Sequence, residues 1–382
     1  MNDSRPSINT RLAQVGRSHL DPAGAVSVPI YQTAMFRHPG LGQSTGYDYS
    51  RSANPTRTAL EQAIASLEGG ARGLAFASGM AAITTIALLF RSGDHLVLSD
   101  DLYGGTYRLF QQVLAPFGLE TSYLDTGNLS GVAEAIRPNT KALFIETPTN
   151  PTMKVSDLAA LAGLGRERGL LTIVDNTFMT PYLQRPLELG CDLVVHSATK
   201  YLGGHNDLVA GLAVARDRQL GDRLATLQNA TGGVLGPQDC WLLMRGMKTL
   251  GVRLDRQQES ATAIARWLLE HPRVEQLHYP GLPSHPGAAI HSRQASGAGG
   301  MVSFAVREPG LVERVLSRVR LISFAESLGG VESLITFPAV QTHADVPAEV
   351  RERLGITDRL LRLSVGIEAA EDLIADLEQA LA

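Results

Sequence analysis

Hydrophobic and polar positions follow two periods along the chain from about residue 57. Segments with the helical spacing of apolar residues alternate with short, fully apolar runs of strand length. The pattern predicts helices at 58–67, 79–90, 106–115 and 157–168, and strands at 74–77, 95–99, 142–146, 171–174 and 193–195. Such alternation predicts an α/β fold: a mostly parallel sheet with helices on both faces, which binds ligands at the carboxyl ends of its strands.

The pattern changes beyond about residue 237. Residues 238–269 predict one long helical region, straight or bent, followed by Pro- and Gly-rich loops, a strand at 301–306 and a closing helix at 370–381. The first 50 residues show little periodicity and many Pro, Gly and Ser residues. We therefore expect three parts: an extended arm over 1–50, which usually needs a partner surface, a large α/β domain over 51–246, and a smaller C-terminal α+β domain over 247–382.

Composition narrows the class of protein. The 382 residues are 44% hydrophobic and 19% charged with a net charge of −4, which suits a globular protein and argues against nucleic acid or an anionic membrane as a partner. The two cysteines form no CxxC motif, so neither a disulfide framework nor a metal site is expected. No secretory signal or uninterrupted membrane span is present, and we expect a cytoplasmic protein.

Lys200 is the first candidate for chemistry. It lies in SATKYLGGHND, directly after a short apolar strand, where a side chain faces the ligand crevice of a parallel sheet. Partial burial would lower its pKa and make it a nucleophilic amine. The alternative is a surface lysine in a Gly-rich turn.

Asp175 ends the apolar strand of LTIVDNTF. A carboxylate in that position needs a cation or a hydrogen-bond donor. The protonated pyridine nitrogen of pyridoxal phosphate (PLP) would supply both and would strengthen the cofactor as an electron sink. The alternative is a helix N-cap.

A phosphate site is indicated where the strand and helix of AFASGMAA meet at Ser78, Gly79 and Met80. The free amides at a helix start, with a serine hydroxyl beside them, bind anions. Ser197 and Thr199 could add two more hydroxyl donors. The alternative is an ordinary tight turn.

Tyr103, Arg108 and Arg362 complete the set of candidates. The Tyr103 ring could stack on a flat cofactor, and its hydroxyl could act as an acid or base, although buried packing is the commoner fate of tyrosine. Arg108 could meet a carboxylate or phosphate, or lie on the surface. Arg362 interrupts an apolar strand, which indicates either a grip on a substrate carboxylate or a structural salt bridge. Together with Lys200, Asp175 and the Ser78 turn, these residues favour one PLP site.

With these motifs the chain resembles the trans-sulfuration group of fold-type I PLP enzymes over nearly its whole length, from about Ser27. That group includes cystathionine γ-synthase, γ-lyase and β-lyase, methionine γ-lyase and O-acetylhomoserine sulfhydrylase. The matching runs are YDYSRSANPTR, FASGMAA, DLYGGTYR, ETPTNP, VDNTF, HSATKYLGGH, ESLGGVESL and RLSVGIE.

The resemblance implies a fold-type I PLP-dependent transferase-like fold and a role for each matched residue. Lys200 would form the Schiff base and, with Tyr103, serve in catalysis. The other cofactor contacts would come from Asp175, Ser78, Gly79, Met80, Ser197, Thr199, Thr177 and, across a subunit boundary, Tyr49 and Arg51. The substrate contacts would come from Arg362, Ser333, Asn150, Glu332 and Arg108. Members of the group are usually homotetramers built from two active dimers that act on small amino acids.

The resemblance leaves the reaction open. Gly105 stands where methionine γ-lyases typically carry cysteine, and Glu332 resembles γ-synthases and γ-lyases more than those β-lyases that have tyrosine there. We favour elimination or replacement at Cγ of cystathionine or an activated homoserine, with β-lyase as the alternative, followed by O-acetylhomoserine sulfhydrylase and methionine γ-lyase. The alternative that is not an enzyme is a catalytically silent binding protein, and the presence of Lys200 and Asp175 argues against it.

Overall fold

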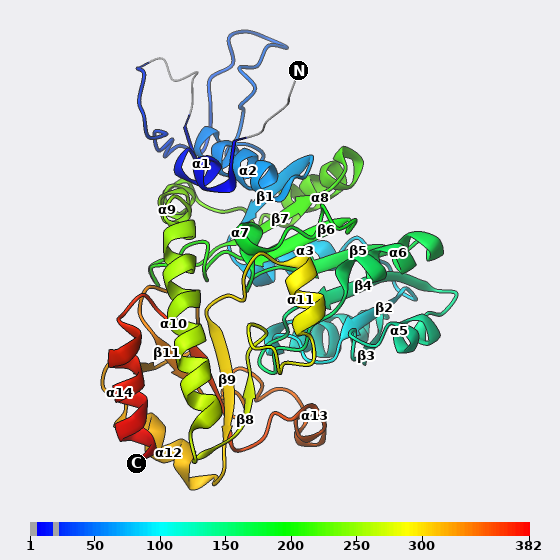
Figure 1. Ribbon diagram of the computed structural model, residues 1–382. Coiled ribbons are helices and arrows are strands. Elements are labelled where there is room, and N and C mark those ends of the chain that lie inside the picture. The colour runs from blue at the N-terminus through cyan, green and yellow to red at the C-terminus, as the bar shows by residue number, and fades with distance from the viewer. Residues whose placement is uncertain (1–5, 18–22) are drawn as a thin grey trace.

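The computed structural model describes residues 6–17 and 23–382, so the parts of the predicted arm at 1–5 and 18–22 lie outside the described residues. Two sheets organise this part of the chain (Figure 1). None of its helices combines the length and the apolar character that crossing a bilayer requires.

The large sheet has seven strands within the described residues, in the order β1-β7-β6-β5-β4-β2-β3. β7 pairs antiparallel with both β1 and β6, and the other pairs are parallel. The strands are β1 (Arg72–Phe76), β2 (His95–Ser99), β3 (Glu120–Leu124), β4 (Thr140–Glu146), β5 (Leu171–Asp175), β6 (Leu193–Ser197) and β7 (Gly211–Ala215). The mostly parallel sheet is therefore confirmed, with one antiparallel strand inserted beside β1.

Helices cover both faces of this sheet, as the apolar runs predict. Leu96 and Leu98 of β2 pack on one face, where α3 and α8 lie, whereas Val97 points to the opposite face, where α5 and α6 lie. The helices of this region are α2 (Pro55–Glu68), α3 (Gly79–Ala87), α4 (Gly104–Arg108), α5 (Leu129–Ala135), α6 (Leu158–Arg168), α7 (Thr180–Leu183), α8 (Arg218–Thr231) and α9 (Pro237–Met247). After α4 the chain continues as a π-helix (Leu109–Leu114) and a short 3₁₀ turn (Ala115–Phe117).

The smaller sheet has the order β10-β11-β12-β9-β8 and is antiparallel except for β10 and β11. Its strands are β8 (Val274–His278), β9 (Met301–Val306), β10 (Ser323–Phe324), β11 (Leu334–Thr336) and β12 (Leu360–Ser364). The helices around it are α10 (Leu250–Glu270), α11 (Ala288–Gln294), α12 (Gly310–Arg318), α13 (Ala348–Leu354) and α14 (Ala370–Leu381). This smaller α+β unit confirms that part of the predicted fold class.

The long helical region predicted over 238–269 is two helices, and that prediction is corrected here. α9 ends at Met247 and α10 begins at Leu250, so the chain turns at Lys248 and Thr249. The start of α10 belongs to the core of the large sheet and its later turns to the core of the small one. Its 21 residues join the two units, and the helix runs along the left of Figure 1.

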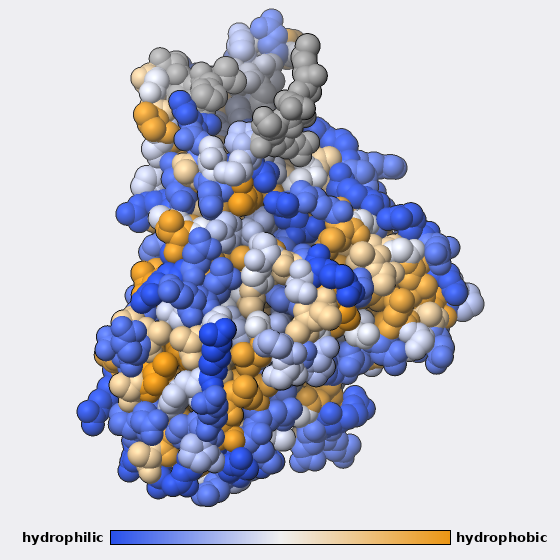
Figure 2. All heavy atoms as spheres, viewed as in Figure 1, coloured by the Kyte–Doolittle hydropathy of each residue, from blue (hydrophilic) through white to orange (hydrophobic). Residues whose placement is uncertain are grey.

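The arm contains one element that its composition does not predict, the helix α1 (Ile8–Ala13). The Ser7 hydroxyl accepts a hydrogen bond from the Thr10 amide at its N-terminus, and Leu12 is buried in the same core cluster as residues of α2 and α9. The rest of the described arm has no helix. The face seen in Figure 2 is mostly hydrophilic, with hydrophobic side chains gathered over α5 and α6.

Candidate active site

A cavity of about 430 Å³ lies at the carboxyl ends of the parallel strands, between the large sheet and the smaller unit. This is the place that a doubly wound sheet predicts for a ligand. Most residues singled out from the sequence line it. They are Ser78, Gly79, Met80, Tyr103, Arg108, Asn150, Asp175, Thr177, Ser197, Thr199, Lys200 and Arg362.

Lys200 follows β6 and projects into the cavity. Its Nζ donates a hydrogen bond of 2.7 Å to the Ser327 hydroxyl, which comes from the smaller unit. Burial, together with the positive charge of Arg362, lowers the pKa of Lys200 to about 8, against a smaller opposing effect of Glu326. Near neutral pH a sizeable fraction of this amine is therefore uncharged, as a nucleophile or base requires. The reading of Lys200 as a surface lysine is wrong.

Asp175 lies beside a second buried carboxyl group, that of Glu146. The two residues are register partners at the ends of β5 and β4, and their exposed fractions are 8% and 6%. Burial raises the pKa of both groups, and the charge of Asp175 further raises that of Glu146. Within the part of the chain that the structure describes, neither forms an ion pair. The pair therefore offers a strong acceptor site for a cationic donor inside the cavity.

The helix-cap reading of Asp175 is wrong. Its Oδ1 accepts hydrogen bonds from the amide and the hydroxyl of Thr177, at 3.0 and 2.5 Å, which makes a local turn. The next helix, α7, begins only at Thr180. The Thr177 hydroxyl also accepts the Ser197 amide at 2.8 Å and so ties the end of β5 to the end of β6.

The turn before α3 has the features of an anion site. Ser78 is the N-cap, and its hydroxyl accepts the Ala81 amide at 3.0 Å. The first amides of a helix have no partner within the helix, and Gly79 and Met80, the first two residues of α3, line the cavity. A Cβ on Gly79 would lie 2.9 Å from the Ser197 Cβ, so a larger residue would push α3 away from β6.

The hydroxyls near this turn are not equally free. Thr199 accepts the Ala210 amide at 3.0 Å, and its Oγ1 lies 3.3 Å from the Ala210 carbonyl. Its backbone contact therefore competes with any role in holding an anion. Ser197 lines the cavity beside Gly79.

Tyr103 caps α4 at the mouth of the cavity, and its side chain is 39% exposed. Its backbone amide donates a 2.9 Å hydrogen bond to Glu146 Oε2, and this bond fixes the backbone position from which the ring extends. A Cβ on Gly105 would lie 2.4 Å from Cε1 of this ring. The ring is thus open on one side to the cavity and closed on the other by Gly105.

Arg362 on β12 is 1% exposed, and its guanidinium reaches across to the large unit. Nη1 donates to Asn150 Oδ1 at 2.8 Å, and Nη2 donates to the Ser327 carbonyl at 3.0 Å. Nε is buried without a hydrogen-bond partner. Because no carboxylate pairs with it among residues 6–17 and 23–382, the structural salt-bridge reading is wrong, and the site has room for a carboxylate ligand.

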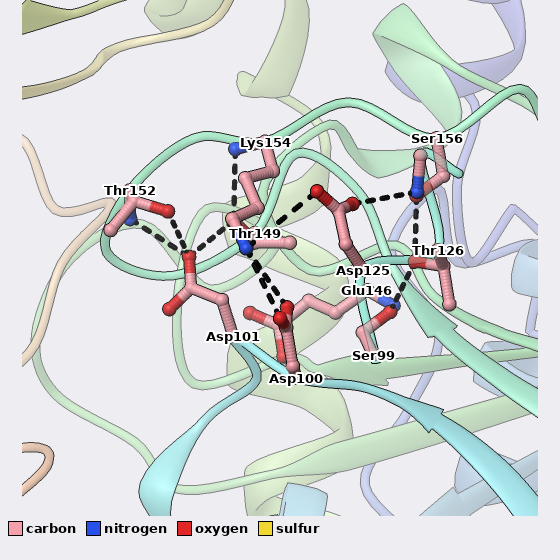
Figure 3. Close-up of polar contacts among 11 residues, drawn as sticks. Ser99, Asp100, Asp101, Asp125, Thr126, Glu146, Thr149, Thr152, Lys154 and Ser156 are labelled. Carbon is pink, nitrogen blue, oxygen red and sulfur yellow. Dashed lines mark hydrogen bonds and ion pairs between the residues drawn. The ribbon is translucent and has the colours of Figure 1, made fainter. Parts of the chain in front are cut away.

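A network of polar contacts behind the cavity holds the loop that carries Asn150 (Figure 3). The buried Asp101 carboxylate accepts hydrogen bonds from the Thr149 hydroxyl at 2.5 Å and the Thr152 amide at 3.1 Å. Lys154 lies 3.1 Å from Asp100 at the same end of the loop. The Asn150 amide is therefore presented to Arg362 on a fixed loop.

Two predicted substrate contacts lie outside the cavity lining. The Ser333 hydroxyl donates to Glu368 Oε2 at 2.8 Å and accepts the Gly366 amide, also at 2.8 Å. Glu332 is exposed, and its Oε2 accepts a 2.7 Å hydrogen bond from Asn206.

Tyr49 and Arg51, the predicted contacts to a neighbouring subunit, are also away from the cavity of their own chain. The Arg51 guanidinium carbon lies 5.8 Å from the centre of the Tyr49 ring, and its Nη1 donates to the Asn229 carbonyl at 2.7 Å. Both residues are exposed and lie where the arm joins the large unit.

Several cavity residues escaped the sequence reasoning, namely Glu146, Glu326, Ser327, Gln341, Thr342 and Asp345. Glu146 gave a usable signal, because it ends an apolar strand just as Asp175 does. The others come from segments of the smaller unit that show no periodicity.

Comparisons with known proteins agree with this geometry. A family model described as Cys/Met metabolism PLP-dependent enzyme matches residues 9–382. The cystathionine gamma-lyase of Bacillus subtilis is 56% identical over 94% of this chain and 95% of its own length. The cystathionine beta-lyase MetC of the same organism is 52% identical over 94% of this chain and 92% of its own length. A crystal structure of cystathionine gamma synthase from Xanthomonas oryzae, in complex with aminoacrylate and cysteine, superposes with a TM-score of 0.97 at 43% identity, covering 99% of this chain and 98% of that one.

Proposed function

The chain belongs to the Cys/Met metabolism PLP-dependent enzymes, and from this premise we propose that it breaks or forms the bond between the γ-carbon and its substituent in cystathionine or an activated homoserine. It is a PLP-dependent trans-sulfuration enzyme. Beyond this family-level activity, we propose the γ-carbon as the reacting position and a role for each of the residues below.

The chemistry of the donor set fits PLP. An amine of lowered pKa, a buried carboxyl pair without a cation, and free helix amides beside Gly79 meet in one cavity. We assign the aldehyde carbon to Lys200 Nζ and the pyridine nitrogen to Asp175. We assign the phosphate to the Gly79 and Met80 amides with Ser78, Ser197 and Thr199, and further support to Thr177.

When bound, PLP draws electron density from the α-carbon of an amino acid and so makes its protons labile. The chain's own residues then bind, orient and move protons. Arg362 binds the α-carboxylate through its unpaired Nε and the nitrogens now held by Asn150 and Ser327. Tyr103, which lines the cavity, would stack on the pyridine ring of the cofactor and limit the access of water from the mouth.

Lys200 is the observation that carries the proposal. Chemistry at the γ-carbon requires protons to leave two adjacent carbons, and one mobile base that reaches both carbons can serve both steps. Lys200 Nζ stands on a long unbranched side chain, its pKa is near 8, and its hydrogen bond goes to the Ser327 hydroxyl. It can therefore take a proton from Cα, move to Cβ, and return the proton later.

Other reactions of the family remain alternatives. A cystathionine β-lyase would use the same lysine at Cα alone. A methionine γ-lyase is disfavoured, because Gly105 stands where those enzymes typically carry cysteine. In this structure the Cβ of a side chain at that position would lie 2.4 Å from Cε1 of the Tyr103 ring. An O-acetylhomoserine sulfhydrylase uses the same γ-chemistry with a different thiol acceptor, and a silent binding protein would have no use for the lowered pKa of Lys200.

Assays of three inputs separate these reactions. We expect either 2-oxobutyrate with cysteine from cystathionine, or cystathionine from an acyl-homoserine with cysteine, and Lys200→Ala should lower the rate at least about 1,000-fold. Pyruvate with homocysteine from cystathionine would instead assign the β-lyase reaction. Turnover of methionine alone would assign methionine γ-lyase, and full activity of the Lys200→Ala variant would overturn the role of the lysine.

The assembly and the location of the enzyme belong to the same proposal. Tyr49 and Arg51 are exposed at the junction of the arm and the large unit, away from the cavity of their own chain. Residues that complete the phosphate site of a neighbouring subunit would lie in such a place. We therefore propose a homotetramer of two active dimers. Cys191 and Cys240 are buried free thiols, which suits a reducing, cytoplasmic setting.

A further inference from the structure

Two carboxyl groups stand side by side in the cavity, and the proposed function uses only one of them. Glu146 ends β4, Asp175 ends β5, and the two are register partners on neighbouring parallel strands. Both line the cavity and both are buried. Two ionised carboxylates in such a place would repel each other with little water to screen them, so one of the two groups is expected to keep its proton.

The surroundings of Asp175 favour its ionised form more than those of its neighbour do. Burial raises the pKa of Asp175, whereas two hydrogen bonds from Thr177 and the charge of His196 on β6 lower it. The two bonds come from the Thr177 amide at 3.0 Å and the Thr177 hydroxyl at 2.5 Å. Since hydrogen bonds to the charged form stabilise that form, Asp175 is the better holder of the negative charge.

The surroundings of Glu146 favour its neutral form. Burial raises the pKa of Glu146 well above its usual value, and the negative charges of Asp175 and Asp101 raise it further. Hydrogen bonds from the backbone amides of Tyr103, at 2.9 Å, and of Asn150 act in the opposite direction. An amide can donate to the carbonyl oxygen of a protonated carboxyl as well as to a carboxylate, so these contacts persist when Glu146 carries the proton.

Arg362 faces the same cavity from the smaller unit and gives the proton on Glu146 a use. Burial lowers the pKa of Arg362 to about 10, and negative groups nearby, Glu146 and Glu326 among them, oppose this shift. Arg362 Nε is buried without a hydrogen-bond partner. An ionised Glu146 would therefore compete with a substrate carboxylate for the guanidinium, whereas a neutral one leaves it free.

We propose that Glu146 keeps a proton in the working enzyme while Asp175 is ionised, so that the pair carries one negative charge to match the one positive charge of a pyridinium ring. Glu146 is then a positioning residue. It holds the backbone of Tyr103, and as a neutral neighbour it leaves Asp175 to the cofactor and Arg362 to the substrate. This inference rests on the assignment of the pyridine nitrogen to Asp175 in the proposed function.

Glu146→Gln tests the inference, because glutamine has the shape of a protonated glutamic acid and carries no charge. In the unfolded chain a glutamate loses its proton near pH 4.5, whereas the folded protein holds the proton on Glu146 to a much higher pH. The wild type therefore loses stability as the pH rises above about 4.5, and the glutamine variant does not. In the cofactor-free protein the unfolding midpoint of Glu146→Gln should exceed that of the wild type at pH 8, and the gain should shrink toward pH 5.

Two comparisons make that result specific. Glu134→Gln removes an exposed acid on α5 and should show no gain that grows with pH. The infrared difference spectrum between the wild-type holoenzyme and Glu146→Gln at about pH 7.5 should contain the C=O band of a protonated carboxylic acid. Carboxylate bands in its place would mean that Glu146 is ionised, and the inference would fail.

The affinity for PLP separates the inference from the proposed function. Glu146→Gln should bind PLP within about threefold of the wild type, whereas Asp175→Asn should bind it at least about 100-fold more weakly, because it lacks the charge that pairs with the ring. An equal loss in both variants would overturn the inference, as would a Glu146→Gln chain that fails to fold or is less stable at every pH. Tight binding by Asp175→Asn would instead overturn the assignment of the pyridine nitrogen, with the pH-dependent gain still deciding whether Glu146 keeps its proton.

Discussion

At the residue scale the site depends on charges that the fold buries without an ion-pair partner. Lys200, the Asp175–Glu146 pair and Arg362 have none among the described residues. Removing an ionised group from water costs several kcal/mol, and an unpaired one recovers little of it. A fold keeps such groups where a ligand supplies the missing counter-charges, and a cofactor with a cationic ring nitrogen and a substrate with a carboxylate would do so.

The lowered pKa of Lys200 predicts a pH dependence in the cofactor-free protein. Burial and the Arg362 charge disfavour the ammonium form, so the neutral amine becomes dominant above about pH 8. Only the neutral amine attacks an acylating reagent, and labelling of Lys200 should therefore rise with pH and reach half its maximum near pH 8. Mass spectrometry of the digested protein measures this, with the exposed Lys141 as the internal comparison. Labelling of Lys200 that begins only above about pH 10 would contradict the lowered pKa of this amine.

At the scale of elements the cavity is made by the close approach of the start of α3 to the end of β6. Ser78 caps the helix, and Gly79 leaves the space that Ser197 fills on the other side. The Thr177 hydroxyl joins β5 to β6 in the same layer. These contacts fix the helix amides relative to Lys200, three residues after Ser197.

Gly79→Ala tests that approach. Its Cβ would lie 2.9 Å from the Ser197 Cβ and 3.0 Å from its Cα, and both atoms belong to a buried sheet that yields little. We expect about tenfold weaker binding of PLP, with a loss of about 1–3 kcal/mol in the free energy of unfolding. Reconstitution titrations and denaturant unfolding measure these two quantities.

Gly163→Ala is the matched control for that substitution. Gly163 lies inside α6, and an added Cβ would meet no atom within 4 Å. It should leave PLP affinity unchanged and stabilise the protein by up to about 1 kcal/mol, because alanine is the better helix former. If Gly79→Ala behaved like this control, the tight α3–β6 approach would not matter for the cofactor.

The sequence predicts some of these elements well, for identifiable reasons. The predicted bounds of β2 and β9 agree with the structure, because each apolar run has the length of a strand and is bounded by turn residues. The sequence analysis does not predict β7, since Gly211–Ala215 combines one glycine and two alanines with only one β-branched residue, a composition that suits either a strand or a buried helix. The break between α9 and α10 escaped because apolar positions continue on both sides of Lys248.

The same contrast holds within the site. Lys200, Asp175 and the Ser78 turn stand at strand ends, where local pattern and topology together give their place. Ser327 and Asp345 meet Lys200 and Arg108 only because the smaller unit folds back over the strand ends. Ser327 has a φ of 111°, a conformation that a serine adopts only when its surroundings enforce it. No local pattern predicts contacts of this kind.

At the scale of the whole molecule the cavity is shared between two units and, by our proposal, between two subunits. Hydrogen bonds from Lys200 to Ser327 and from Arg362 to Asn150 cross from one unit to the other. Tyr49 and Arg51 are exposed and lie away from the cavity of their own chain, where a neighbouring subunit could meet them. The proposed active unit is therefore a dimer with two composite sites.

A hybrid of two inactive chains tests this arrangement. A Lys200→Ala chain keeps Arg51 for its neighbour, and an Arg51→Ala chain keeps Lys200, so a mixed dimer has one intact site. Hybrids isolated with two different affinity tags after co-expression should recover roughly a quarter or more of wild-type activity.

The control hybrid pairs Lys200→Ala with a chain that carries both substitutions, which leaves no intact site, and it should stay inactive. If the first hybrid were no more active than this control, Arg51 would act within its own subunit or not at all.

The most direct test of the account is to find the lysine that carries PLP. Borohydride treatment of the yellow holoenzyme reduces the bond between cofactor and lysine to one that survives digestion, and mass spectrometry then locates the modified peptide. We predict a single pyridoxyl group on Lys200, and no label in the Lys200→Ala variant. A label on another lysine, or a colourless protein that PLP cannot reconstitute, would contradict the central claim.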